Sequence, residues 1–212
     1  MESKTTHTLE FRFKCIRCGN CCTDEKTIVN LTYSDILRIK EGLNLSLKEV
    51  IEIIGFYFYD KELSEEERKK MVITPMMTEK GLAFAGLRKD DSGVCYFYDK
   101  NTERCKIYDL RPNFCRTFPF FFRIFFDESN KTRAKIKMDY TEKGKQYCSG
   151  IGVEMPLVNE DEWINVGVKT IEDLNDNHIV IQRWNDAIKS QRITPKVENF
   201  LLNIFKLQKK KR

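Results

Sequence analysis

Eight cysteines are the residues of this chain whose type and spacing can do chemistry. Four of them fall within the single stretch Cys15-Ile16-Arg17-Cys18-Gly19-Asn20-Cys21-Cys22. A two-residue gap between thiolates lets a tight turn direct both sulfurs to one metal ion. Gly19 can adopt the left-handed backbone that turns N–H groups toward the sulfurs and offsets their charge. The stretch is therefore predicted to be half of a metal-thiolate centre.

Cys22 follows Cys21 directly, and neighbouring side chains of an extended chain point in opposite directions. The two thiols are therefore not expected to bind one small ion in the same way, and one of them is expected to face a second site. The other four cysteines are single and far apart in the chain, at Cys95, Cys105, Cys115 and Cys148.

The composition is that of a globular protein in a reducing compartment. With 212 residues and 41% hydrophobic content, the chain can bury a sizeable core as one large domain or as a domain with an appendage. It has no apolar run of about 18 residues and no apolar stretch near its start, so we expect no membrane span and a cytoplasmic location. Reduced thiols there favour metal over disulfides, except in a hyperthermophile, where disulfides persist.

The formal net charge of +5 does not predict a nucleic-acid-binding surface. Four thiolates around a dication leave a charge of about −2, so two such sites would lower the net charge to about +1. The C-terminal run 209–212 alone supplies four positive charges and carries no interleaved aromatic residue. We therefore expect no nucleic-acid partner, and a redox or protein partner of unknown identity.

Residue patterns predict an α+β fold, with a small, mostly antiparallel sheet, helices around it and a helical C-terminal part. Residues 9–158 are predicted to form the cysteine-cluster domain and residues 159–212 a helical extension packed on it. Thr32 with Asp35, and Ser46 with Glu49, are typical of helix starts, for helices that end at Gly42 and at about Tyr59.

Alternation and aromatic content predict the remaining elements. Strands are expected at 9–14, 28–31, 71–74, 82–88 and 94–98, and a hairpin is expected from a buried strand at 117–127 and a partner at 131–140. A solvated charged segment is expected at 64–70, a loop at 141–146 and helices at 163–174, 179–189 and 196–210.

Two motifs together carry a resemblance to a known family. The stretch CxxCGxCC at 15–22 and the later stretch CKIYDLRPNFCRTFP at 105–119 resemble the YkgJ-like cysteine-cluster family, which is described as a zinc- or iron-chelating domain. The resemblance runs from about residue 11 to residue 150. It implies that all eight cysteines form the cluster: Cys15, Cys18, Cys21, Cys22, Cys95, Cys105, Cys115 and Cys148.

Either zinc or iron-sulfur clusters would use these cysteines four at a time. The simplest division places Cys15, Cys18 and Cys21 with one remote cysteine, and Cys22 with the other three. The CxxCxxC spacing is that of bacterial ferredoxins and differs from the CxxxCxxC of radical enzymes that use S-adenosylmethionine.

Scattered single cysteines, together with an aromatic shell that would exclude water, favour iron. The aromatic residues in question are Phe97, Phe114, Phe118 and Phe120. We therefore expect an iron-sulfur protein with one or two clusters, acting in electron transfer or as an oxidoreductase. The alternative is a zinc-binding structural or interaction module, or a metal-handling protein, without catalysis.

Three residues of the second motif are candidates for cofactor binding. Arg111 and Arg116 could donate hydrogen bonds to cluster sulfurs, offset thiolate charge or hold an anionic substrate; ordinary ion pairs are the alternative. Tyr108 could donate a proton or simply pack. The two histidines, His7 and His178, lie outside the motifs and are not expected to be ligands.

Overall fold

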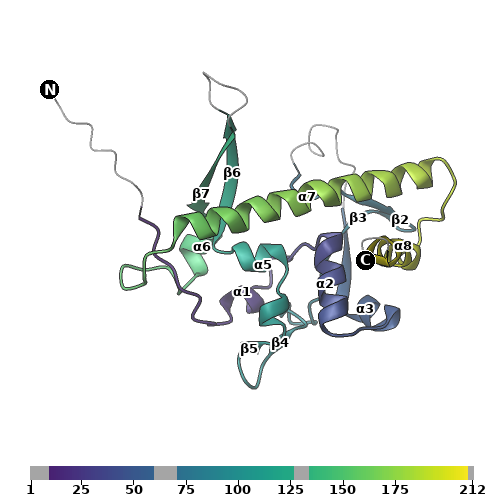
Figure 1. The fold of residues 1–212 in the computed structure, drawn as a ribbon. Coiled ribbons are helices and arrows are strands. Elements are labelled where there is room, and N and C mark those ends of the chain that lie inside the picture. The colour runs from purple at the N-terminus through teal and green to yellow at the C-terminus, as the bar shows by residue number, and fades with distance from the viewer. Residues whose placement is uncertain (1–9, 60–70, 127–133, 210–212) are drawn as a thin grey trace.

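The structure is a computed structural model, and it describes residues 10–59, 71–126 and 134–209. The fold is α+β, as predicted (Figure 1). The helices of the described residues are α1 (Asn20–Thr23), α2 (Tyr33–Gly42), α3 (Leu47–Ile53), α5 (Asn113–Thr117), α6 (Glu142–Tyr147), α7 (Glu160–Lys189) and α8 (Val197–Lys209), with a 3-10 turn η1 (Tyr108–Leu110).

The strands of the described residues form three separate antiparallel units. One is a three-stranded sheet in the order β1-β3-β2, and the others are the two-stranded pairs β4-β5 and β6-β7. Their bounds are β1 (Ile54–Phe58), β2 (Met76–Thr78), β3 (Gly81–Leu87), β4 (Tyr98–Asp99), β5 (Arg104–Cys105), β6 (Phe120–Phe126) and β7 (Ala134–Tyr140).

Helix α7 joins the two hydrophobic cores of the molecule. It is a single helix of 30 residues, about 45 Å long at 1.5 Å per residue, and it crosses the whole molecule in Figure 1. Its C-terminal half packs Ile181 and Trp184 into the larger core with α2, α3, α8 and the three-stranded sheet. Its N-terminal half places Trp163 against a smaller core around Phe120.

The predicted break between two helices at residues 175–178 is wrong, because polar residues of α7 bond to other segments. The side chain of Asn177 is buried and accepts a hydrogen bond from the backbone N–H of Tyr33 at 2.9 Å. The side chain of Asn185 accepts one from Met77 N at 2.8 Å and donates one to Pro75 O at 3.0 Å. These partners are distant in sequence, so local propensity does not reveal them.

Both predicted helix starts are present, each as a capping box, but the second helix ends early. Thr32 and Asp35 cap α2, and Ser46 and Glu49 cap α3, each pair exchanging both expected hydrogen bonds. The chain leaves the helix after Ile53, six residues before the predicted end, because the sequence Ile-Gly-Phe-Tyr-Phe pairs as β1 with β3 instead. Aromatic and β-branched residues favour that pairing.

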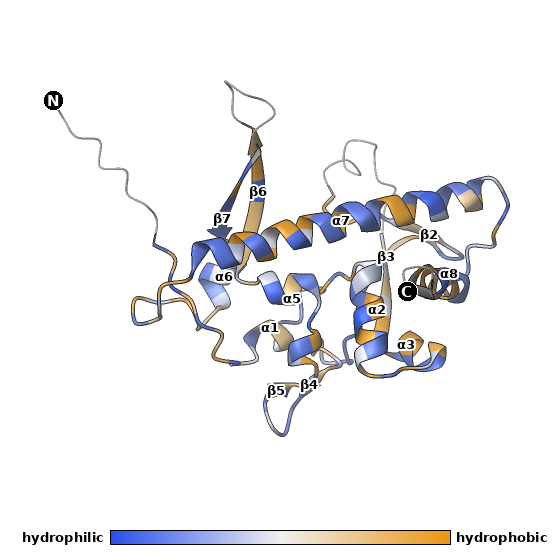
Figure 2. Cartoon of the chain, in the orientation of Figure 1, coloured by the Kyte–Doolittle hydropathy of each residue, from blue (hydrophilic) through white to orange (hydrophobic). Residues whose placement is uncertain are grey.

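The hairpin is confirmed, although its first strand is not buried along its length. Phe120 pairs with Tyr140 at the base, and Phe126 pairs with Ala134 at the far end. Phe120 is buried whereas Phe126 is 65% exposed. Figure 2 shows β6 as mostly hydrophobic and β7 as mostly hydrophilic.

Other predicted elements differ in position or type. The strand expected at 82–88 is β3. The strand expected at 71–74 is not formed, and β2 begins two residues later, at Met76. The region expected as a strand at 94–98 instead leads into the short β4-β5 pair. Residues 9–14 and 28–31 make isolated bridges instead of named strands, within the part described. Residues 142–147 form α6, not a loop, because the Thr141 hydroxyl caps Gly144 N at 2.8 Å. The segment 64–70 lies outside the described residues.

The C-terminal helix α8 is confirmed and packs on α2 and α3 through one face. Phe200, Leu201 and Ile204 on that face are at most 2% exposed. The division of the chain at residue 158 stays a prediction. No helix in the described ranges is long and apolar enough to cross a membrane.

Adjacent leucines of α8 provide a matched test of this packing. Leu201 is fully buried, whereas Leu202 is 43% exposed. We expect Leu201→Ala to lower the free energy of unfolding by about 2–5 kcal/mol, because it leaves a cavity between α8 and its neighbours. Leu202→Ala should have little effect. Chemical denaturation of both variants checks this, and equal stabilities would contradict the packing of α8.

Candidate metal centre

The cysteine loop turns through two left-handed residues before it enters α1. Arg17 has φ 57° and Gly19 has φ 80°. A Cβ atom at Gly19 would lie 2.6 Å from the Tyr98 hydroxyl, so both backbone conformation and space require glycine here. The Gly19 carbonyl then accepts the first hydrogen bond of α1, from Cys22 N at 2.7 Å.

Cys21 and Cys22 therefore lie on a helical turn, and the expectation of an extended chain at this point is wrong. On a helix, successive side chains are rotated by about 100° instead of pointing oppositely. The Cys22 thiol lies within hydrogen-bonding reach of both Cys21 and Cys105. Helical geometry thus lets two adjacent cysteines face one region of the molecule.

Four distant segments bring their cysteines to one cavity of about 60 Å³. Arg17, Gly19, Tyr108, Arg111 and Phe118 also line it. The cysteines that border it are Cys15, Cys18, Cys21, Cys22, Cys105, Cys115 and Cys148. Cys95 does not border it but is held next to it, because Cys95 N donates a hydrogen bond to Cys22 O at 2.8 Å. The structure thus gathers all eight predicted residues in one region.

Hydrogen bonds beside Cys15 and Cys148 join two segments that are distant in sequence. Lys14 N donates to Gly150 O at 3.0 Å, and a Cβ atom at Gly150 would lie 2.3 Å from the Lys14 carbonyl oxygen. The Asn20 side chain donates to Tyr147 O at 3.0 Å and to Ser149 Oγ at 3.2 Å, on both sides of Cys148. The N-terminal loop is therefore fixed to the end of α6.

Cys115 is positioned by the buried carboxylate of Asp35. One oxygen of Asp35 accepts from Arg38 Nη2 at 2.5 Å and from Asn113 N, the first residue of α5, at 3.0 Å. Arg38 Nη2 also donates to Arg111 O at 2.9 Å. Burial raises the pKa of Asp35, whereas Arg38 and the backbone N–H groups favour its ionised form. The sequence pattern indicates Asp35 only as part of a helix start.

The thiols differ in their readiness to ionise. The Cys22 thiol has one proton to donate, and its hydrogen bond lowers the pKa of whichever of Cys21 and Cys105 accepts it, while nearby Arg111 lowers the pKa of both. The same contacts raise the pKa of Cys22. Burial raises the pKa values of Cys95, Cys115 and Cys148. A hydrogen bond from Cys22 and the nearby Arg111 guanidinium thus favour a thiolate at Cys21 or Cys105.

Arg17 and Arg111 both stack on the ring of Tyr108. Their guanidinium carbons lie 3.9 Å and 3.7 Å from its ring centroid, within the range of cation–π contacts. Arg111 Nε also donates to Tyr108 O at 2.8 Å. Burial and contact with Cys15 raise the pKa of Tyr108, so its hydroxyl remains protonated and can donate to the Cys15 sulfur. Arg17, a basic residue between two loop cysteines, was missed by sequence analysis.

Arg116, unlike Arg111, does not border the cysteine cavity. It borders a separate cavity of about 250 Å³ that also touches Cys15, Tyr108 and Arg111. Among the described residues, Arg17, Arg111 and Arg116 form no ion pair with a carboxylate, so the ion-pair alternative has no support there. Two guanidinium groups thus border the cysteine cavity and a third stands beside it.

The predicted aromatic shell is only partly beside the thiols. Phe118 borders the cysteine cavity, whereas Phe114 and Phe120 line a larger cavity next to it. Phe97 is buried in the larger core. His178 lies on α7, where it hydrogen-bonds to Thr74 at 2.6 Å, and does not line the cysteine cavity. His7 lies outside the described residues.

The donor set fits a metal that prefers sulfur. Within residues 10–59, 71–126 and 134–209, no carboxylate or imidazole borders the cysteine cavity, so its described lining does not suit Mg²⁺ or Ca²⁺ and suits zinc or iron-sulfur clusters. In the ranges that the structure describes, no three potential ligands converge as tightly as the ligands of a single ion do. The thiols instead border a space several times the ~10–15 Å³ that one water-sized atom needs.

These features define a metal-binding protein with thiol ligands, and the comparisons agree. Residues 14–149 match the CxxCxxCC family, described as a "putative zinc- or iron-chelating domain", and the chain belongs to that family. The chain is also 24% identical over 199 residues to the uncharacterized protein MJ0661 of Methanocaldococcus jannaschii, covering 94% of this chain and 86% of that one. No solved structure matches the chain significantly.

The close contact at Gly150 predicts an effect on metal binding. Gly150→Ala would press its methyl group against the Lys14 carbonyl and separate the Cys15 and Cys148 segments. We expect a loss of about 1–3 kcal/mol in unfolding free energy and a lower metal content per chain. Gly152→Ala is the control, since its Cβ atom would meet nothing within 4 Å. Equal metal content in the two variants would contradict this role for Gly150.

The Asp35 network predicts an effect on stability. Asp35→Asn keeps the shape of the side chain but leaves the Arg38 guanidinium without its charged partner, so we expect a loss of about 3–5 kcal/mol in unfolding free energy. Asp90→Asn removes the exposed partner of Lys100 and should change stability little. Denaturation curves of both variants provide the measurement, and an Asp35→Asn protein as stable as the parent would refute the anchoring role.

Proposed function

We propose that the protein is an iron-sulfur protein that acts in electron transfer or as an oxidoreductase in the cytoplasm. The observation that supports it most strongly is the set of seven thiols around one cavity of about 60 Å³, larger than a single ion requires. Two clusters would use all eight cysteines. An iron-sulfur cluster, when bound, supplies one-electron transfer.

The positions of the cysteines support a division into two sets. Cys148 is close enough to Cys15, Cys18 and Cys21 for their charges to raise its pKa. Cys22 lies close to Cys105 and Cys95, and Cys115 is close to Cys95 and Cys105, while Cys21 is close to both Cys22 and Cys115 and so lies at the boundary between the two sets. We assign Cys15, Cys18, Cys21 and Cys148 to one site, and Cys22, Cys95, Cys105 and Cys115 to the other.

The surroundings of the thiols suit a redox centre at the surface. Cys15, Cys18 and Cys21 are exposed, so an electron partner could approach one side of the centre closely. On the protein side, Phe13 and Phe118 border the cavity and limit the access of water. Arg17, Arg111 and Tyr108 would offset the negative charge of the bound thiolates and hydrogen-bond to sulfur. Arg116 could hold an anionic group beside Cys15.

Zinc remains a second candidate, with its own supporting observation. The left-handed Gly19 directly after Cys18 is the arrangement expected of a zinc knuckle, in which backbone N–H groups face the sulfurs. A zinc-binding protein would use the metal for folding energy and for interaction or metal handling, without catalysis.

Optical spectroscopy with elemental analysis separates the two candidates. Anaerobically purified protein should be brown, contain iron, and absorb at about 400 nm with bleaching on reduction. We expect Cys148→Ser and Cys105→Ser each to remove about half of the iron and the double variant to remove nearly all of it. Val153→Ser, at a position 83% exposed near Cys148, is the control.

Two outcomes would contradict these proposals separately. Colourless protein with stoichiometric zinc would refute the iron-sulfur centre. Complete loss of iron in either single cysteine variant, with the fold retained, would refute the division into two sets.

A further inference from the structure

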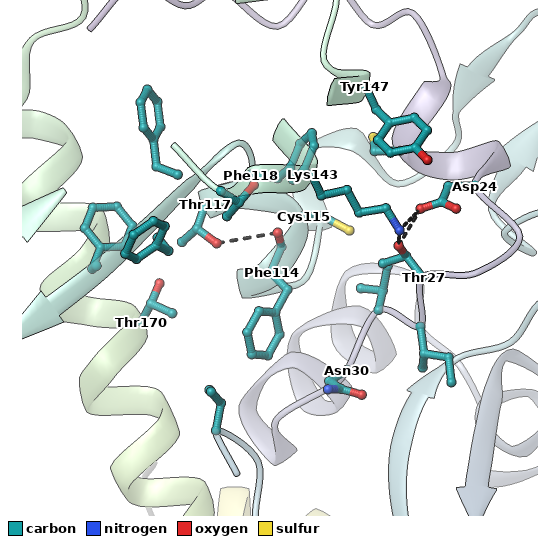
Figure 3. Close-up of a pocket in the computed structure, with 18 of the residues that line it drawn as sticks. Asp24, Thr27, Asn30, Phe114, Cys115, Thr117, Phe118, Lys143, Tyr147 and Thr170 are labelled. Carbon is teal, nitrogen blue, oxygen red and sulfur yellow. Dashed lines mark hydrogen bonds and ion pairs between the residues drawn. The ribbon is translucent and has the colours of Figure 1, made fainter. Parts of the chain in front are cut away.

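A second cavity, of about 460 Å³, adjoins the cysteine cavity and lies within the size range of small-molecule sites. The two cavities share Asn20, Cys21, Cys115, Phe118 and Tyr147 as lining residues. Its walls come from α5, α6, α7, strand β6 and the segment before α2, so several elements distant in sequence enclose it (Figure 3).

The walls are largely aromatic. Phe114 and Phe118 come from α5 and the residue that follows it, and Phe120, Phe121 and Phe122 come from β6. Phenylalanine rings pack against another ring in edge-to-face or offset arrangements that add to the gain from burial. An aromatic ligand would therefore match this surface better than water does, because apolar cavities do not hold water well.

The polar groups of the cavity are mostly engaged with the protein. The hydroxyls of Thr117 and Thr170 donate to carbonyls of their own helices, at 3.0 Å and 2.9 Å. The Lys143 ammonium reaches Asp24 and Thr27, and Figure 3 shows these three residues together at one side of the cavity. None of these groups needs a hydrogen bond from a ligand, because each already has a partner within the protein.

Asn30 is the exception. It lines the cavity, and its Oδ1 is buried and has no hydrogen-bond partner in the described part of the chain. A buried carbonyl without a partner is costly, so a ligand that donates a hydrogen bond to it gains both affinity and orientation. Among the described residues that line the cavity, Asn30 is the one with a buried polar side-chain atom that has no partner.

We propose that this cavity binds an aromatic hydroxy compound, whose ring packs among the phenylalanines and whose hydroxyl donates a hydrogen bond to Asn30 Oδ1. A ligand there would lie against Cys21 and Cys115, at the edge of the cysteine centre. The binding site is independent of which metal the cysteines hold. Only its use as a substrate site rests on the proposed redox function.

Calorimetric titration of the purified, metal-loaded protein with 2-naphthol and 2-methoxynaphthalene tests the proposal. The two probes share a ring system, but only 2-naphthol has a hydroxyl that can donate. We expect 2-naphthol to bind more tightly. Asn30→Leu should weaken 2-naphthol about fivefold, as expected for one hydrogen bond, and should leave 2-methoxynaphthalene unchanged or slightly stronger.

Variants that fill the cavity test the location. Ile171→Trp on α7 places an indole among the lining residues and should weaken 2-naphthol at least tenfold. Asn175→Trp adds the same group at an exposed position of α7 outside the cavity and should have no effect. If Ile171→Trp does not fold, Leu174→Phe replaces it. This change enlarges another lining residue by less and should also weaken the binding of 2-naphthol.

Three results would overturn the proposal. They are no measurable binding of 2-naphthol to the parent protein, equal binding by the parent and a folded cavity-filling variant, and equal loss of both probes in Asn30→Leu. Iron content and absorbance, measured on the same samples, report on the metal proposal separately. A zinc protein that binds 2-naphthol as described would refute the redox function and leave the cavity assignment intact.

Discussion

The buried carboxylate of Asp35 is the interaction on which the positions around the cysteines depend. One side chain caps α2, neutralises Arg38 and accepts the first backbone N–H of α5, which carries Cys115. Because Arg38 in turn donates to the Arg111 carbonyl, the same pair fixes the chain between η1 and α5. A charge taken out of water needs partners, and here one of the partners of Asp35 is the first N–H of the helix that carries Cys115.

That the eight cysteines lie together could be predicted from sequence, because closely spaced thiols have few other uses in the reducing compartment that the sequence predicts. The hydrogen bonds that hold the cysteine segments together could not be predicted from sequence. The bond from Lys14 to Gly150 and those from Asn20 to the residues beside Cys148 join positions more than a hundred residues apart. Arg17 could have been found, since it is a cation between two loop cysteines. No pattern in the sequence indicated the ion pair between Asp24 and Lys143.

Elements with strong local signals were predicted well. The boxes Thr32–Asp35 and Ser46–Glu49 begin helices because each exchange of hydrogen bonds lies within four residues. The end of α3 was not predictable locally, because β3, some 30 residues later, provides the partner for β1. The continuity of α7 likewise depends on Tyr33 and Met77, which bond to its polar side chains. In both cases, contacts with segments distant in sequence determine the structure more strongly than local propensity does.

The contact between the cysteine loop and the end of α6 has a consequence for the order in which the chain can assemble. Asn20 and Tyr147 are separated by 127 positions, so a ribosome must release most of the chain before the two can meet. The larger core also waits, since Ile181 and Phe200 complete it. During synthesis the four N-terminal thiols emerge first and remain without their structural neighbours for several seconds, at about 5–20 residues per second. The cysteine region can therefore assemble only after the chain has been released to about residue 150, and the larger core only after α8 has followed.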